Sequence, residues 1–141
     1  FRIGFVPSTL YGYLPAILRD FRAARPATEI VVYEMTSIEQ IAALKEGRID
    51  VGFGRIPFDD DAIARLTLRH EALAAALPDG HKALVQPGLQ RSGVQYRALD
   101  VPGATSPVIM SHRVGDQSPE LVVVLDVIRA VYVREGVAFG V

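Results

Sequence analysis

The sequence has no cysteine among its 141 residues, which excludes a disulfide framework and any metal site made of thiolates. It has no apolar run long enough to span a membrane, and it lacks the basic flank and apolar region of a secretion signal. It also has no basic block, and its formal net charge is −1, so nucleic-acid binding by these residues has no electrostatic support. Half of the residues are hydrophobic, and we therefore expect one folded cytoplasmic domain with a substantial core.

Strand and helix patterns alternate along the chain. Strands are predicted over residues 1–6, 29–35 and 49–54, and the third is apolar on both faces, as a central strand of a parallel sheet should be. Helical spacing follows each of the first two strands, and a last helix begins at Ser118 with Pro119 in its first turn. This alternation predicts an α/β fold, a three-layer α/β/α lobe around a mostly parallel sheet of about five strands.

The middle of the chain is less regular. Residues 62–77 fit a helix or a strand, and we favour a strand from about Leu66 because Pro78 ends the pattern abruptly. Residues 94–99 are expected to re-enter the main sheet, and residues 107–113 to form a further strand.

The helices carry apolar residues at the spacing of a buried face. In the second predicted helix these are Ile38, Ile41 and Leu44, and Gly47 is the expected end of that helix. The last helix has extra valines beside its buried stripe, which widen its apolar surface. We therefore expect this protein to associate with itself.

Two of the predicted strands run directly into hydroxyl-bearing helix starts. Ser8 and Thr9 follow the first strand, and Thr36 and Ser37 follow the second. In a parallel sheet both helix N-termini would open at one edge, with unpaired N–H groups and positive dipole ends. No catalytic group lies between them, so the pattern indicates a receptor for a small carboxylate rather than an enzyme. The alternative, that these hydroxyls only cap their helices, is favoured by helix physics alone.

Other chemistry does not assemble in the sequence. His70, His81 and His112 are far apart and lack the spacing of metal ligands. Residues 59–61 are three aspartates without the alternating ligands and glycine of a calcium loop. Neither a nucleophile elbow nor a dinucleotide fingerprint is present. We therefore predict no metal, no cofactor and no enzymatic activity.

The order of several short motifs resembles one known family. The stretch from FRIGFVPSTLYGYLP through YEM to LKEGRIDVGFGR, followed by LRHEALAAALPDGH, is similar to the first part of the effector-binding domain of LysR-type transcriptional regulators. The later stretches GATSPVIMSHR and SPELVVVLDVIRAVY resemble the end of the same domain. Within the family, the similarity is to activators of aromatic-compound catabolism that sense benzoate or muconate.

The resemblance implies a two-lobed fold like that of a type II periplasmic binding protein. In the family, lobe one is formed by the first and last parts of the domain, and lobe two is inserted between them. In this chain residues 1–84 and 85–141 match lobe one, and the inserted lobe and the N-terminal DNA-binding domain are absent. The chain also starts inside a predicted strand without an initiator Met, so we expect it to be cut from a longer protein.

The resemblance also implies an effector site. Ser8 matches the effector-contacting turn of the family, with Thr9 beside it, and Ser37 with Thr36 falls where the subgroup places a second hydroxyl. Arg55 follows the third strand, and it either borders the effector cleft or only balances the aspartates at 59–61. The expected effector is a carboxylate such as muconate or benzoate, and a dicarboxylate lying across the cleft would have one end near each helix N-terminus.

Arg69 is a more ambiguous position. It follows Leu68 in the predicted strand and is most simply a solvated residue beside Glu71, although contact with an aromatic carboxylate together with Tyr96 is an alternative.

The function implied is that of an effector-sensing regulatory domain of a LysR-type activator. Its expected partners are a small-molecule effector, further copies of itself, and DNA through the absent N-terminal domain. One alternative is a lobe of a periplasmic-type solute-binding protein, and another is a lobe used only for protein association. The residues upstream of Phe1 would distinguish the regulator from the solute-binding protein, since they would form a winged helix-turn-helix in the regulator and a lipoprotein signal in the solute-binding protein.

Overall fold

The computed structural model describes residues 1–78, 90, 91 and 93–138. These residues form two compact units, one from residues 1–69 with those from 107 onward, and the other from residues 70–106. None of the helices in the described part is long and apolar enough to cross a membrane. The boundary expected near residue 84 lies outside the described residues, as does His81.

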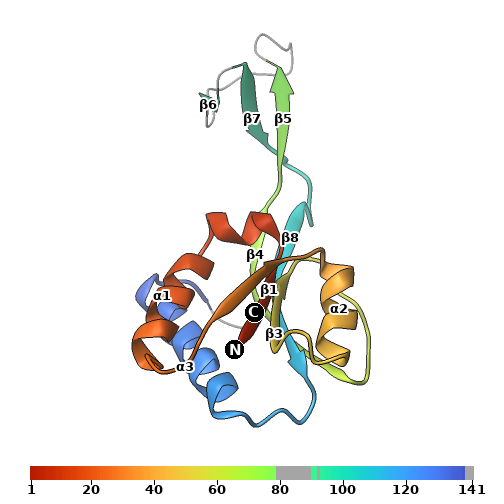
Figure 1. Ribbon diagram of the computed structural model, residues 1–141. Coiled ribbons are helices and arrows are strands. Elements are labelled where there is room, and N and C mark those ends of the chain that lie inside the picture. Colours follow the sequence, from red (N-terminus) through yellow and green to blue (C-terminus); the bar gives the residue numbers. More distant parts are fainter. Residues whose placement is uncertain (79–89, 92, 139–141) are drawn as a thin grey trace. The chain divides into compact units, whose positions relative to one another are not determined.

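The first unit is built on a five-stranded sheet (Figure 1). The strands are β1 (Arg2–Phe5), β2 (Val31–Glu34), β3 (Val51–Gly54), β4 (Ile63–Ala72) and β8 (Thr105–Arg113), in the order β2-β1-β3-β8-β4. The pairs β1–β2 and β1–β3 are parallel, whereas β3 and β8 are antiparallel. The sheet is therefore mixed, and its fully buried strand β3 lies at the centre, as predicted for residues 49–54.

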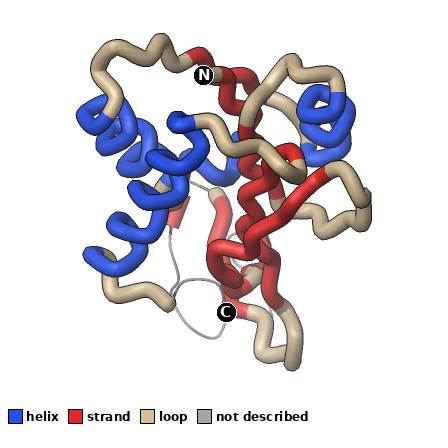
Figure 2. The backbone as a smooth tube through the Cα atoms, turned by 90° about the horizontal axis from the view of Figure 1, so that it is seen from below, coloured by secondary structure: helices blue, strands red, loops and turns tan. Residues whose placement is uncertain are grey.

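Helices cover both faces of this sheet (Figures 1 and 2). A 3₁₀ helix, η1 (Pro7–Tyr11), precedes α1 (Leu14–Ala24), and α1 lies with α3 (Pro119–Arg134) on one side. On the other side lies α2 (Ser37–Lys45). The predicted three-layer α/β/α arrangement is therefore confirmed.

The core divides between the two faces of the sheet. The larger cluster joins α1 and α3 to the strands, and Phe21 and Tyr132 are its largest fully buried side chains. The smaller cluster lies under α2 and contains Ala43, Leu44 and Ile49. Ile38 was predicted on this buried face but is 67% exposed, because Gln40 and Ala43 turn inward in its place.

The second unit is a separate three-stranded antiparallel sheet. It comprises β5 (Ala74–Pro78), β6 (Gln90–Arg91) and β7 (Val94–Ala98), in the order β5-β7-β6. The strand prediction from about Leu66 is confirmed by β4 and β5.

The prediction that residues 94–99 re-enter the main sheet is wrong, since β7 pairs with β5. The place beside β3 belongs to β8, which supplies the contiguous buried residues Val108, Ile109 and Met110. Residues 94–98 include Gln95 and Arg97 and cannot meet that need for a strand buried on both faces.

Candidate functional site

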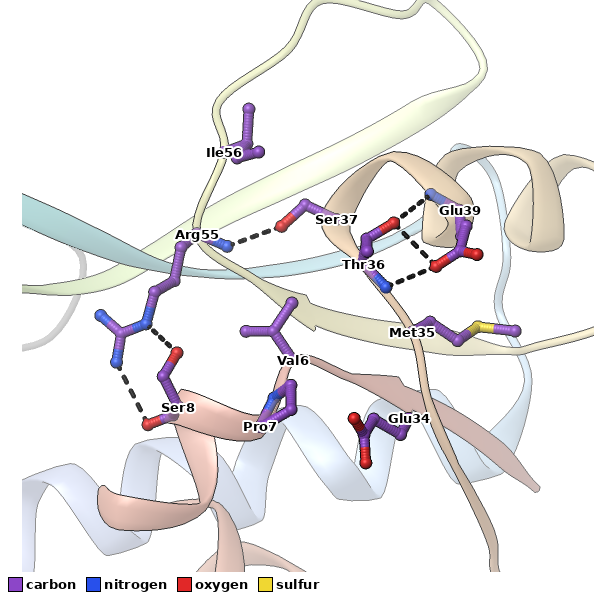
Figure 3. Close-up of a pocket in the computed structure, with 10 residues that line it drawn as sticks. All are labelled: Val6, Pro7, Ser8, Glu34, Met35, Thr36, Ser37, Glu39, Arg55 and Ile56. Atoms are coloured by element: carbon purple, nitrogen blue, oxygen red, sulfur yellow. Dashed lines mark hydrogen bonds between the residues drawn. The ribbon is translucent and has the colours of Figure 1, made fainter.

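A pocket of about 440 Å³ opens where β1, β2 and β3 end (Figure 3). All three strands are parallel, so their carboxyl ends meet at the same edge of the sheet. The pocket is lined by ten residues that follow or end these strands, namely Val6, Pro7, Ser8, Glu34, Met35, Thr36, Ser37, Glu39, Arg55 and Ile56. Four of the five predicted site residues are thus brought together.

Thr36 fixes the first turn of α2. Its Oγ1 accepts a hydrogen bond from the N–H of Glu39 at 3.2 Å, and the Glu39 carboxylate accepts from the Thr36 N–H at 2.7 Å and from the Thr36 hydroxyl at 2.8 Å. This reciprocal capping box lowers the pKa of Glu39 below its ordinary value, because both groups of Thr36 donate to the charged carboxylate. Thr36 therefore serves the helix, and its hydroxyl is already engaged.

Arg55 joins the two sides of the pocket (Figure 3). Its main-chain N–H donates to Ser37 Oγ at 3.1 Å, and its Nε donates to Ser8 Oγ at 2.6 Å. Its Nη2 also donates to the carbonyl oxygen of Ser8 at 3.3 Å. Each serine oxygen thus accepts a bond from Arg55, which leaves each hydroxyl hydrogen to be donated elsewhere.

The start of α2 adds two further donors. Among the described residues, the N–H groups of Ser37 and Ile38 donate no hydrogen bond within the protein, as expected in the first turn of a helix. They lie at the positive end of the helix dipole. Together with the serine hydroxyls and the Arg55 guanidinium, this end of the pocket suits an anion.

The rest of the pocket is apolar or acidic. Val6, Pro7, Met35 and Ile56 provide apolar walls, and Ile56 is 51% exposed. Glu34 also lines the pocket, from the end of β2. The combination of an anion-holding end and apolar walls fits a small organic acid.

Thr9 does not line this pocket. It is buried within η1, and its hydroxyl donates to the Val6 carbonyl at 2.7 Å. The helix-capping alternative is also wrong for Ser8 and Thr9, because η1 has Val6 as its N-cap residue and no side-chain capping bond. It is right for Thr36, and Ser37 is the first helical residue that follows.

Arg55 lines the pocket, whereas two of the aspartates at 59–61 pair with other cations. Of the three aspartates that Arg55 might balance, Asp59 pairs with Arg65 and Asp60 with Lys45. Asp60 also accepts from the Ala62 N–H, and none of the described residues forms a group of three side chains that could hold a metal ion.

Arg69 is not the solvated residue that the strand pattern suggested. Its Nη1 donates to the Tyr132 hydroxyl at 2.8 Å, and its guanidinium carbon lies 4.6 Å from the centre of the Tyr13 ring. Tyr96, proposed with it, belongs to the second unit.

Sequence reasoning missed Gln40. This side chain of α2 is only 3% exposed, and its Nε2 donates to the carbonyls of Met35 and Phe53, both at 3.2 Å. A signal was present, since Gln40 lies three and four residues before Ala43 and Leu44 and therefore shares their buried helical face.

Comparison with known proteins identifies the family. The profile described as "LysR substrate binding domain" matches residues 1–87. The chain is 31% identical over 198 aligned positions to the probable cat1 operon transcriptional activator of Acinetobacter lwoffii, with 92% of this chain and 65% of the relative covered. It is 51% identical over 80 residues to the transcriptional regulator BenM of Acinetobacter baylyi, with 57% of this chain and 26% of BenM covered.

Solved structures agree. A crystal structure of the effector binding domain of a BenM variant matches with a TM-score of 0.90 at 26% identity, covering 99% of this chain and 97% of that one. A structure described as the BenM effector binding domain with its effector benzoate matches with a TM-score of 0.86, also at 26% identity, covering 98% and 94%. The chain covers less than two thirds of the length of the curated relatives given above. Family and fold together agree with the expectation of a non-enzymatic protein, and the chain belongs to the LysR substrate-binding domain family.

Proposed function

We propose that this chain is the effector-sensing domain of a LysR-type activator of aromatic-compound catabolism, and that its pocket binds a small aromatic acid or a muconate-like dicarboxylate. The observation that carries the proposal is the bridge made by Arg55, which donates to Ser37 from its main chain and to Ser8 from its side chain. This bridge turns two hydroxyls from different segments into donors at one end of one pocket. Two of the relatives named above are transcriptional regulators, and one of the solved structures is of the BenM effector binding domain with benzoate, which supports the same assignment.

The binding chemistry follows from these donors. One carboxylate of the ligand accepts from the hydroxyls of Ser8 and Ser37 and from the N–H groups that begin α2, while its apolar body lies against Val6 and Ile56. A hydrogen bond to a charged group contributes about 1.5–3 kcal/mol, so two such bonds reach a micromolar dissociation constant only when a closing cleft also excludes water.

The wider role is proposed on the same basis. The effector makes its contacts in a closed form of the complete domain and shifts the population toward that form. Residues 1–84 and 85–141 are the two parts that the resemblance assigns to lobe one, with the inserted lobe missing between them, and the DNA-binding domain belongs to a longer protein. That protein works in the cytoplasm as a homo-oligomer and meets DNA through its N-terminal domain. The family match favours this regulator over a periplasmic solute-binding protein.

Titration calorimetry of the full-length protein with benzoate and with cis,cis-muconate tests the proposal. We expect at least one of them to bind, and Ser8→Ala with Ser37→Ala to weaken that binding by more than tenfold together. Ser118→Ala is a matched control. Ser118 caps α3 and lies near Phe1, at the amino end of β1, whereas the proposed site lies at the carboxyl end of that strand. Unchanged affinity in the double variant would contradict the assignment of the site. If the unmodified protein binds neither acid, the proposed ligand class is wrong.

A further inference from the structure

The buried amide of Gln40 lies between the two segments that build the pocket. Its Nε2 donates to the carbonyl oxygen of Met35, which follows β2, and to that of Phe53 in β3. These strands are not neighbours, because β1 lies between them in the sheet. A single side chain from α2 therefore links the ends of two strands across a third.

Glycines make room for this link. A Cβ atom added at Gly52 would lie 2.5 Å from Gln40 Oε1, and one added at Gly4 would lie 3.2 Å from Gln40 Cγ. One added at Gly54 would lie 3.6 Å from Gln40 Oε1 and only 2.8 Å from Ser37 Oγ. The side chain of Gln40 thus occupies a track that β1 and β3 leave open because their residues there lack side chains. Such close packing holds the amide in one orientation.

Each carbonyl that Gln40 binds lies next to the pocket in the sequence. Met35 precedes Thr36 and Ser37, and Phe53 is two residues before Arg55. Gln40 therefore fixes both chain segments that the hydrogen bond from the Arg55 N–H to Ser37 Oγ joins. Main-chain bonds from the Met35 N–H to the Phe5 carbonyl and from the Val6 N–H to the Phe53 carbonyl tie each segment to the end of β1, and Gln40 adds a direct link between the two.

We propose that Gln40 is a positioning residue of the pocket, which acts through Ser37 and Arg55 and does not itself touch the ligand. It holds the Ser37 hydroxyl against the Arg55 N–H, so that the hydroxyl hydrogen is directed into the pocket. The effect of Gln40 on ligand affinity rests on the proposed function. The effect of Gln40 on the hydrogen bond of the Arg55 N–H does not depend on the proposed function.

Two substitutions of similar size separate the donor from the bulk of the side chain. Gln40→Leu keeps most of the volume and removes both hydrogen bonds. Gln40→Glu replaces the amide by a carboxyl group, whose pKa is raised by burial and by the two carbonyl oxygens facing it. The protonated carboxyl still donates one bond, whereas the carboxylate donates none. Gln117, exposed in the loop between β8 and α3, provides the matched controls Gln117→Leu and Gln117→Glu.

The first readout needs no ligand. Amide hydrogen exchange of the full-length protein should show protection of the Arg55 N–H reduced at least tenfold in Gln40→Leu, with protection of Val31 in the β1–β2 ladder unchanged. Protection that is retained at Arg55, or lost equally at both amides, would overturn the proposal. The first outcome shows that the bond does not need Gln40, and the second shows a general loss of stability.

The second readout is the pH dependence of affinity for benzoate, the probe, between about pH 5.5 and 8, where benzoate stays ionised. We expect Gln40→Leu to bind about tenfold more weakly than the unmodified protein at every pH. Gln40→Glu should bind nearly normally at the acidic end and lose affinity as pH rises. Equal affinity of Gln40→Leu and the unmodified protein would overturn positioning. If benzoate and cis,cis-muconate both fail to bind the unmodified protein, the ligand assignment falls, and the exchange of the Arg55 N–H alone decides for or against Gln40.

Discussion

Ser8 and Ser37 both accept a hydrogen bond from Arg55, but their loss should have different consequences for stability. Ser37 is 6% exposed, and its Oγ is the acceptor for the main-chain N–H of Arg55. In Ser37→Ala this half-buried N–H loses its partner, which costs about 1–3 kcal/mol. Ser8 is exposed, and the Arg55 Nε that it binds can be hydrated when the hydroxyl is removed. Ser8→Ala should therefore cost less than about 0.5 kcal/mol.

The effect on ligand affinity should instead be alike. Each substitution removes one hydroxyl donor from the anion-holding end of the pocket, and we expect about a tenfold rise in the dissociation constant for either benzoate or cis,cis-muconate. Urea denaturation provides the free energy of unfolding, and calorimetry on the same samples provides the affinity. Ser118→Ala, which removes a helix cap away from the pocket, should lower stability and leave affinity unchanged.

Three results would refute this reasoning. Equal destabilisation by Ser8→Ala and Ser37→Ala would contradict the assigned difference between an exposed and a buried partner of Arg55. An affinity loss in Ser118→Ala as large as that in Ser37→Ala would show that affinity follows stability. Unchanged affinity in both pocket variants would show that the two serines bind Arg55 and not the ligand.

Three further predictions concern stability. Thr36→Ala should cost about 1 kcal/mol at neutral pH in urea denaturation, as is typical of a lost N-cap. Thr36 holds the pKa of Glu39 in the folded protein below its ordinary value. The stability that comes from these hydrogen bonds is therefore present above the ordinary pKa and is lost as pH falls through the pKa of the folded state. The difference in free energy of unfolding between Thr36→Ala and the unmodified protein should narrow in acid. Gly52→Ala should destabilise by about 1–3 kcal/mol, since its Cβ would overlap the buried Gln40 amide, and unchanged stability would show that Gln40 can move aside. Phe21→Ala, which empties a fully buried site beside the Phe1 ring, should cost about 3–5 kcal/mol, and a cost below about 1 kcal/mol would contradict the described core.

Much of the first unit could be predicted from local patterns. The apolar run at residues 49–54 indicated a central strand, and Ser118 with Pro119 indicated the start of α3, because each signal depends on neighbouring residues only. The convergence of Ser8, Ser37 and Arg55 could also be predicted, because parallel strands bring their carboxyl ends to one edge.

Other features depend on partners distant in the sequence. The separate pairing of β7 with β5 is a choice between sheets, and the alternation within residues 94–98 does not encode it. Arg69 looks solvated in its strand, but Tyr13 and Tyr132 reach it from α1's start and from α3. Gln40 links the segment after β2 to β3 through room left by glycines of β1 and β3, and no spacing within α2 reveals that contact.

The central claim is that the pocket at the ends of β1, β2 and β3 holds the carboxylate of an organic acid. Crystal structures of the full-length protein grown with saturating benzoate and with saturating cis,cis-muconate test it most directly. We predict that in at least one of them a carboxylate oxygen accepts hydrogen bonds from the hydroxyls of Ser8 and Ser37, with Arg55 still bound to both serines. The account would be contradicted if both acids were bound elsewhere in the protein and neither occupied this pocket.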